Sequence, residues 1–443
     1  MIFSTTTFLL YFLPLFFCVY YCSPKNFRNK ILLLGSVLFY SWGAPAFIFI
    51  ILISTYIDFH VVNALYAAYT NHYRKLLLSL SIFINLGLLA YFKYANFFIE
   101  NVNTLLYSFG INTIEWANVA LPIGISFYTF QTLTYSIDIY RKTAKPLYRV
   151  SDYMLYIMSF PQMIAGPIVR FNSIVDQIIH RNDCFDDKLI GFYRFCIGLS
   201  KKVLIANVMA EQADLVFNND LNNLNITSAW VGILAYTFQI YFDFSGYSDM
   251  AIGLGKMLGF QFPENFNSPY VSTSITEFWR RWHITLGDFM RDYLYIPLGG
   301  NRVSSKYRFF FNLWIVFLLS GLWHGAEWNF ILWGIYHGLF LIFDRLFLLG
   351  FLQRIGTSLA TFFTFLCVMF GWILFRLDNL DSIQLYFSKL FSFNSGFHCI
   401  AKTEFWFTLL LAVVFSFFVN FQAGEKIKNY FFNRRFYKLQ EHV

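Results

Sequence analysis

The stretch Ser320–His337, SGLWHGAEWNFILWGIYH, decides how the rest of the chain is interpreted. It places His324, Glu327 and His337 inside sequence that is otherwise apolar. An ionisable side chain at membrane depth is costly, so such groups usually face a bundle interior or a water-filled cavity. Gly321 and Gly325 flank His324, and small residues let a second helix or a substrate approach the backbone closely. We therefore interpret the chain as a scaffold that brings other groups to His324.

The composition predicts an all-α polytopic membrane protein. Apolar residues make up 57% of the 443 residues and charged residues 13%, and the mean hydropathy is +0.51. Apolar runs of about 20 residues recur along the chain, whereas the short alternating segments of a β-barrel are absent. The net charge of +8 comes from basic clusters between these runs, which indicates topology and contact with acidic lipid rather than nucleic acid. The cysteines and histidines show no zinc-like spacing, so no metal is expected.

The apolar runs predict about eleven transmembrane helices. They cover residues 2–21, 31–43, 46–66, 76–99, 119–140, 189–217, 226–250, 307–323, 328–347, 355–375 and 403–421. Lysine and arginine gather in the odd-numbered loops and in the C-terminal tail, and the intervening loops carry few or none. Because cytoplasmic loops are enriched in these residues, the N-terminus is expected outside and the C-terminus in the cytoplasm.

Two stretches depart from simple spanning helices. Residues 158–170 contain Pro161, Gly166 and Pro167 within apolar sequence, which predicts a re-entrant or cavity-lining segment. Residues 263–301 are rich in aromatic side chains and in both signs of charge, which predicts interfacial helices at the cytoplasmic face. No internal repeat is visible, so residues 1–443 are interpreted as a single membrane-embedded domain.

The segment Thr276–Asp292, TEFWRRWHITLGDFMRD, could carry chemistry. On one continuous helix, Trp279, Trp282 and His283 would share a face. The neighbouring charged residues could then pair with one another, with lipid phosphate or with an anionic ligand; these are Arg280, Arg281, Asp288 and Arg291. A basic interfacial helix with aromatic anchors is the simpler alternative.

His324 is either a general base or a histidine that is hydrogen-bonded in the core. Imidazole titrates near neutral pH and suits proton transfer from an attacking hydroxyl or thiol. His337 is assigned a structural role, since it lies too far along the sequence to share the site through local helix geometry. Asp243 and Asp249 are expected to pair with arginines across the bundle or to line a polar cavity.

Taken together, several motifs give the chain a family resemblance. They are Phe278-Trp-Arg-Arg-Trp-His283, Arg291-Asp-Tyr-Leu-Tyr-Ile-Pro-Leu-Gly-Gly-Asn-Arg302, Leu322-Trp-His-Gly325, Tyr241-Phe-Asp-Phe-Ser-Gly-Tyr-Ser-Asp249 and Gly166-Pro-Ile-Val-Arg170. With them the chain resembles the membrane-bound O-acyltransferases, and it is most similar to the branch that contains the alginate and peptidoglycan O-acetyltransferases. The resemblance extends from the first span to about residue 376, with a core at about residues 119–376.

The resemblance implies a ring of tilted helices around a tunnel that joins a cytoplasmic donor site to an outer funnel. By this resemblance His324 is the essential intramembrane histidine, and His283 is a second catalytic polar residue that positions or polarises the donor. Acetyl-CoA is the implied donor, and its site is assigned to Arg280, Arg281 and Trp282. The implied location is the bacterial inner membrane, and the implied partner is a periplasmic serine-hydrolase-type acetyltransferase.

The expected reaction is O-acetylation of an exported polysaccharide, with peptidoglycan first and alginate or another exopolysaccharide second. The residue that would carry the acetyl group in transit is open, with Tyr437 one candidate. A small-solute transporter is an alternative of another class, in which His324, Asp243 and Asp249 would form a relay. A third alternative is a scaffold subunit without chemistry of its own.

Overall fold

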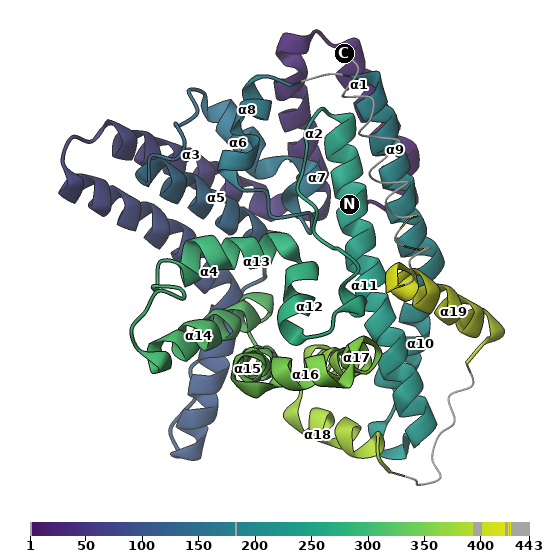
Figure 1. The fold of residues 1–443 in the computed structure, drawn as a ribbon. Coiled ribbons are helices and arrows are strands. Elements are labelled where there is room, and N and C mark those ends of the chain that lie inside the picture. Colours follow the sequence, from purple (N-terminus) through teal and green to yellow (C-terminus); the bar gives the residue numbers. More distant parts are fainter. Residues whose placement is uncertain (1, 182–183, 393–400, 421–423, 425, 427–443) are drawn as a thin grey trace. The chain divides into compact units, whose positions relative to one another are not determined.

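The structure is a computed structural model that describes residues 2–181, 184–392, 401–420, 424 and 426. All the regular secondary structure of these described residues is helical, as the sequence predicted (Figure 1). The chain divides into two compact units. Unit 1 comprises Met1–Phe195 and Met250–Pro263, and unit 2 comprises Cys196–Asp249 and Glu264–Val443. Tyr437, one candidate for the acetyl carrier, and most of the basic tail lie outside the described residues.

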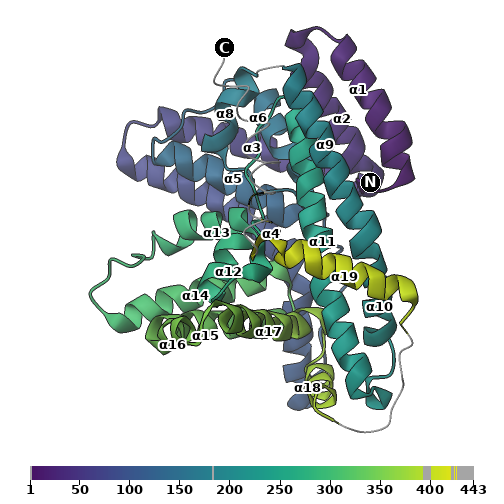
Figure 2. The same ribbon diagram turned by 45° about the vertical axis from the view of Figure 1, so that its right-hand side comes forward.

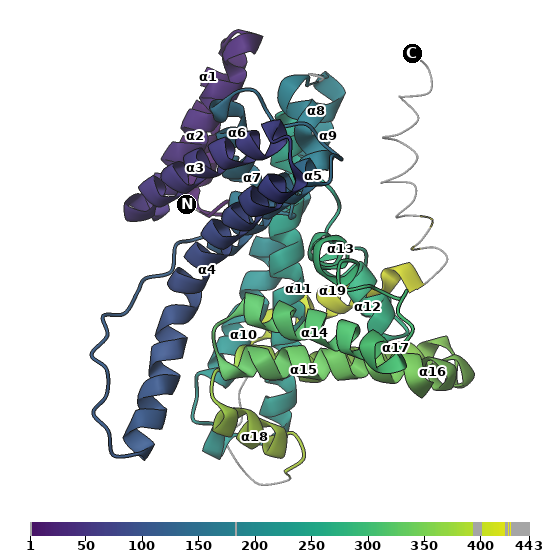
Figure 3. The same cartoon turned by 90° about the vertical axis from the view of Figure 1, so that its left-hand side faces the viewer.

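Unit 1 contains the first helices of the chain and the beginning of α9. They are η1 (Thr7–Phe12), α1 (Leu13–Cys22), η2 (Lys25–Phe27), α2 (Arg28–Gly43), η3 (Pro45–Phe47), α3 (Ile48–Ala67), α4 (Asn71–Ser108), α5 (Ile125–Tyr140), α6 (Val150–Met158), α7 (Phe160–Met163), α8 (Phe171–Ile179) and α9 (Phe185–Ser200). The long helix α4 begins where the Thr70 side chain accepts a hydrogen bond from Tyr73 N, an N-cap. Figure 3 shows the irregular segment that follows α4 running back beside it.

A buried polar network holds four helices of unit 1 together. Asp58 on α3 is fully buried, and its Oδ1 accepts hydrogen bonds from Ser81 Oγ at 2.5 Å and Asn85 Nδ2 at 3.0 Å, both on α4. Its Oδ2 accepts from Tyr153 Oη on α6 at 2.5 Å. Ser136 on α5 joins through Ser81, 2.6 Å between hydroxyl oxygens. Buried polar atoms are costly when unpaired, so these bonds specify how α3–α6 pack.

Unit 2 contains the remaining helices. They are η4 (Lys201–Ala206), α10 (Asn207–Phe217), η5 (Leu221–Asn223), α11 (Ile226–Met257), η6 (Pro269–Val271), α12 (Ile275–Arg281), α13 (Ile284–Met290), η7 (Arg291–Tyr295), α14 (Lys306–His324), α15 (Trp328–Phe343), η8 (Asp344–Leu348), α16 (Leu349–Ile355), α17 (Thr357–Arg376), α18 (Leu380–Lys389), α19 (Thr403–Phe417) and η9 (Phe418–Asn420). The end of α11 belongs to unit 1. In unit 2, α14, α15 and α17 lie side by side (Figure 2).

Each of the predicted spans overlaps a helix or a continuous run of helices, although the span 119–140 is helical only from Ile125 onward. Among the described residues, four helices are long and apolar enough to cross a membrane: Pro45–Ala67, Asn71–Ser108, Trp328–Ile355 and Thr357–Arg376. Thr7–Cys22 and Thr403–Phe417 are apolar but shorter. Helix α11, which carries Asp243 and Asp249, is not among these four helices. The number of crossings thus stays a prediction.

The segment predicted to be re-entrant has little helical structure. Helix α7 spans only Phe160–Met163, and residues 164–170 form no helix, although most of them are buried. Gly166 allows this close packing, since a Cβ atom there would lie 2.7 Å from Gln162 Cα. The prolines and this glycine thus interrupt the helix as expected, whereas entry into the membrane remains untested.

Candidate active site

The antiparallel pair α14 and α15 positions the first predicted catalytic residue. Glycines bring the two helices together, because a Cβ atom on Gly334 would lie 2.6 Å from Phe317 O. Helix α14 ends at His324, and Gly325, in extended conformation, begins the turn that leads into α15. The imidazole of His324 therefore lies at the C-terminal end of α14, where unpaired helix carbonyls favour positive charge.

Aromatic rings surround His324 on three sides. The centroid of its ring lies 4.8 Å from that of Trp323, 5.0 Å from Trp333 on α15 and 5.2 Å from Phe375 on α17, each in an edge-to-face arrangement. The side chain is half-buried rather than sealed. The negative faces of aromatic rings stabilise N–H edges and the imidazolium ion. These three edge-to-face contacts therefore hold the imidazole of His324 in a defined orientation.

His283 lies in a break between two helices rather than on one continuous helix. The prediction of a single helix across Thr276–Asp292 is wrong, because α12 ends at Arg281 and α13 begins at Ile284. His283 has φ +46° and ψ +52°, the left-handed region. This conformation costs a non-glycine residue about 1–2 kcal/mol. It persists because Asn265 O accepts a hydrogen bond from Ile284 N at 3.0 Å, which holds the break in place.

The side chain of His283 is buried and faces one polar partner that sequence reasoning missed. Its Nδ1 lies 3.0 Å from Asn265 Oδ1, which also accepts hydrogen bonds from Thr285 N and Thr285 Oγ1. The ring of Phe244 on α11 lies 4.8 Å from that of His283. His283 lies outside the four candidate spans, and burial lowers the pKa of its imidazole to about 3. The side chain is therefore neutral near pH 7.

Two tryptophans connect three histidines of unit 2. Trp323 contacts both His283 and His324, and its ring centroid lies 6.0 Å from that of His283. Trp333 contacts both His324 and His337, the latter also at 5.0 Å. The separation of His324 and His337 along the sequence is therefore bridged by helix packing.

His337 is fully buried, and neither ring nitrogen has a hydrogen-bond partner in the part of the chain that the structure describes. An unpaired buried polar group costs about 1–3 kcal/mol. Trp279 on α12 covers the imidazole at 5.0 Å between ring centroids, and Gly371 on α17 leaves room for Nε2. The structural role assigned to His337 is not tested by these contacts.

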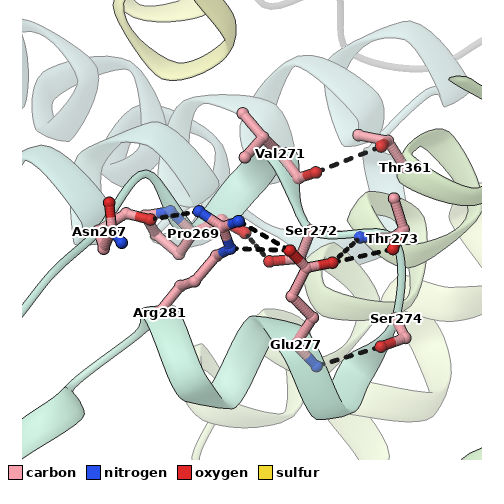
Figure 4. A network of polar contacts seen from close by, with 9 residues as sticks. All are labelled: Asn267, Pro269, Val271, Ser272, Thr273, Ser274, Glu277, Arg281 and Thr361. Carbon is pink, nitrogen blue, oxygen red and sulfur yellow. Dashed lines mark hydrogen bonds and ion pairs between the residues drawn. The ribbon is translucent and has the colours of Figure 1, made fainter. Parts of the chain in front are cut away.

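The predicted donor-binding residues occupy three different environments. Figure 4 shows Arg281, whose guanidinium pairs with Glu277 at 2.8 Å and donates to Asn267 O at 3.2 Å. Arg280 is exposed and makes no ion pair with any residue that the structure describes. Trp282 is buried in an aromatic cluster, with ring centroids 4.9 Å from Trp372. Arg280 is thus the most accessible of the three, and Arg281 is neutralised by its neighbour.

The start of α12 explains why Arg281 is engaged. The sequence Ser274-Ile-Thr-Glu277 has the S-x-x-E pattern of a helix N-terminus, and Ser274 Oγ accepts from Glu277 N at 3.1 Å. Glu277 Oε2 accepts from both N and Oγ1 of Thr273, and its Oε1 accepts from Arg281 (Figure 4). Burial alone would raise the pKa of Glu277, but these hydrogen bonds outweigh burial and lower it. The carboxylate therefore stays charged and holds Arg281.

The two aspartates of the Tyr241–Asp249 motif form ion pairs, as the sequence analysis expected, but with lysines instead of arginines. Lys201 Nζ lies 2.6 Å from Asp249 Oδ2, and Lys202 Nζ lies 2.8 Å from Asp243 Oδ1. Between the aspartates, a Cβ atom on Gly246 would lie 2.8 Å from Gly198 O, so this glycine allows close helix packing. The charges of both carboxylates are thus compensated by lysines. This pairing argues against the relay of His324, Asp243 and Asp249 that a transporter would need.

Comparisons with known proteins agree with the resemblance. Residues 129–377 match the family model of the membrane-bound O-acyltransferases. A protein named "probable alginate O-acetylase" from Azotobacter vinelandii is 45% identical over 395 residues, 89% of this chain and 79% of that protein. The "peptidoglycan O-acetyltransferase" of Helicobacter pylori is 37% identical over 441 residues, 91% of this chain and 82% of that protein. The "teichoic acid D-alanyltransferase" of Bacillus subtilis is 30% identical over 289 residues, 58% of this chain and 69% of that protein.

The chain belongs to the membrane-bound O-acyltransferase family and is an acyltransferase. The predicted family is therefore confirmed. The matched region contains His283 and His324 together with Asn265 and the tryptophans between them. No three His, Cys, Asp or Glu side chains among the described residues come together as a metal site.

Proposed function

We propose that this protein transfers an acetyl group from cytoplasmic acetyl-CoA toward an exported polysaccharide in the bacterial inner membrane. The observation that carries the proposal is the half-buried imidazole of His324, enclosed by aromatic rings at the end of α14 within the family region. This is the environment that a general base for acyl transfer requires, since it holds a reactive nitrogen and stabilises the imidazolium.

In the proposed reaction His324 accepts the proton of an acceptor hydroxyl as the oxygen attacks the acetyl thioester carbonyl. The carbon–sulfur bond then breaks, and the imidazolium returns its proton to the thiolate, so that the base is regenerated. An ester and free coenzyme A are the products. His283 is the second polar residue of the proposed site, joined to His324 through Trp323.

We assign the donor phosphates to the basic end of α12. Arg280 is exposed there and available to an anion, while Arg281 would have to exchange Glu277 for a phosphate. Trp282, buried against Trp372, would support this end of α12 rather than stack on the donor from outside. A replacement Arg280→Ala is accordingly expected to raise the KM for acetyl-CoA more than Trp282→Phe does.

The proposed membrane arrangement has about eleven crossings around a tunnel, the N-terminus outside and the C-terminus in the cytoplasm. It is supported by helices at every predicted span and by the alternation of basic loops. The whole chain is proposed to act as one membrane-embedded domain. Cysteine labelling from each side of the membrane, at Lys75 near the start of α4 and at Glu115 in the segment after α4, would test the sidedness of these two positions.

The acceptor is proposed to be a cell-envelope polysaccharide, reached through a periplasmic serine-hydrolase-type partner. Relatives named for alginate and for peptidoglycan each match about nine-tenths of the chain. The identity of 45% with the alginate relative, against 37% with the peptidoglycan relative, supports an exopolysaccharide at least as well as peptidoglycan. Ester-linked acetate should therefore be measured in both polymer fractions.

The decisive experiment uses a strain that lacks this chain and is complemented with variants. His324→Ala is expected to lower polymer-bound acetate by at least about 100-fold, the usual contribution of a general base. His72→Ala, which removes an exposed histidine of α4, is the matched control and should leave acetate unchanged. Equal membrane levels are verified by immunoblot. Normal acetylation with His324→Ala would overturn the assignment, and donor-independent solute flux in vesicles would support a transporter instead.

A further inference from the structure

The hydrogen bonds around Asn265 determine the orientation of its side-chain amide. Asn265 is fully buried, and Oδ1 lies 3.3 Å from Thr285 N and 2.9 Å from Thr285 Oγ1. A backbone N–H can only donate a hydrogen bond, so the atom that faces Thr285 N must be the oxygen of the amide rather than its nitrogen. This orientation also places Oδ1, an acceptor, 3.0 Å from His283 Nδ1.

The orientation of Asn265 in turn determines the tautomer of His283. Because Oδ1 can only accept, Nδ1 of the imidazole must carry the hydrogen. In a neutral ring, Nε2 then has a lone pair and no hydrogen. Nε2 is buried and has no hydrogen-bond partner among the residues that the structure describes. The ring thus presents an unused acceptor on the side away from Asn265.

We propose that Asn265 is a positioning residue that holds His283 in the Nδ1–H tautomer, so that Nε2 accepts a hydrogen bond from a reacting group in acyl transfer while His324 takes the proton. The inference rests on the proposed function and makes it more specific. A histidine that polarised the donor would need an N–H directed at the acyl carbonyl, whereas Nε2 in this tautomer has none. His283 therefore interacts with a group that donates, such as an acceptor hydroxyl or a water molecule.

A purely structural role for Asn265 makes a different prediction. The backbone at this position already connects two segments, since Asn265 O accepts from Ile284 N, and Asn267 N donates to Arg281 O at 2.9 Å. These bonds do not involve the amide side chain, so replacing that side chain should leave them in place. A structural role would then change stability alone, whereas a positioning role changes the imidazole itself.

The tautomer can be measured directly on the full-length protein in lipid nanodiscs. With ¹⁵N-histidine labelling, the signals of His283 are identified among the eight histidines by their loss in His283→Gln. The expected result at pH 7 is a protonated Nδ1 and an unprotonated Nε2. Asn265→Asp retains an oxygen and should keep this pattern, while Asn265→Leu should lose it. Wild-type protein with a protonated Nε2 would overturn the proposal.

The same variants are then compared in acetyl transfer with acetyl-CoA. Asn265→Leu is expected to lower kcat by about 10- to 100-fold, by analogy with the loss of a partner that orients a metal-ligating histidine. The KM for acetyl-CoA should change little, and Asn265→Asp should recover most of the rate. Ser272→Ala removes a buried hydrogen bond in the same region and serves as the control for general destabilisation. Equal losses in Asn265→Leu and Ser272→Ala would contradict a positioning role.

The tautomer of His283 and the rate of acetyl transfer are measured separately, so failure of the role proposed for Asn265 can be told from failure of the proposed function. The tautomer is measured without substrate, so it can be established even if wild-type protein shows no acetyl transfer. Absence of transfer in wild-type protein would refute the function, whereas active Asn265→Leu protein with an altered tautomer would refute only the role of Asn265.

Discussion

At the scale of single residues, the packing of α17 requires glycine at position 371, because the imidazole of His337 occupies the space that a side chain there would take. A Cβ atom at this position of α17 would lie 2.7 Å from His337 Nε2. Gly371→Ala is therefore expected to destabilise the protein by about 1–3 kcal/mol through overpacking. Thermal unfolding in detergent measures the change. Gly350→Ala on α16 is the control, since no described residue outside its own stretch of helix lies within 4 Å of the added methyl group, and it should not destabilise.

A second prediction at this scale concerns the pH dependence of stability. The pKa of His283 is about 3 in the folded protein, against an ordinary value of 6.5. Between these values the unfolded chain holds more protons, so stability falls as the pH is lowered from 6.5, by up to about 1.4 kcal/mol per pH unit. Glu277 adds a dependence in the same direction only below its ordinary pKa of 4.5.

Unfolding of wild-type protein and His283→Asn is therefore compared between pH 7 and pH 5. Asparagine tolerates the left-handed backbone of this position but does not titrate. The variant should lose less stability than wild type over this interval. Parallel curves for the two proteins would show that His283 is not the group responsible.

At the scale of secondary-structure elements, two ion pairs of unequal burial hold η4 against α11. The side chain of Asp249 is 7% exposed, whereas that of Asp243 is 40% exposed. Removing one member of a buried pair leaves a charge without its partner, so Asp249→Ala should cost about 3–5 kcal/mol. Asp243→Ala should cost less than about 1 kcal/mol, because solvent screens its pair. Equal effects on the unfolding midpoint would contradict this difference in burial.

A double-mutant cycle tests whether the buried pair is the cause. Lys201→Ala and Asp249→Ala, made together, should cost less than the sum of the single changes, since neither charge is then left unpaired. Additive costs would instead indicate that the two side chains act independently.

At the scale of the whole molecule, the division into two compact units predicts separable local stability. Asp58→Ala removes an acceptor from Ser81, Asn85 and Tyr153, which would each lose a partner. Amide hydrogen exchange should therefore rise in α3–α6 and remain near wild-type levels in α14, α15 and α17. A uniform rise across both units would mean that the chain opens as one cooperative structure.

Local sequence patterns are sufficient to predict some elements of this fold but not others. Helices at the apolar runs were predictable because long apolar stretches without strand-like alternation favour helices in a membrane protein. The break at His283 was not, since no glycine or proline marks it and the left-handed conformation is selected by contacts with Asn265. Asn265 itself has no local signal, because it lies in a connecting segment and reaches His283 only through the fold. His324 was selected as a candidate because an ionisable residue in apolar sequence is unusual in itself.

The left-handed backbone at His283 restricts which amino acids could ever occupy that position. Asparagine, aspartate and histidine enter this region of conformational space several-fold more readily than other side chains, and glycine does so freely. If codon 283 is randomised and the variants are selected only for correct membrane insertion, most recovered proteins should therefore carry one of these four residues at position 283. If acyl transfer also requires an imidazole at this position, histidine is the only one of these four residues that meets both requirements.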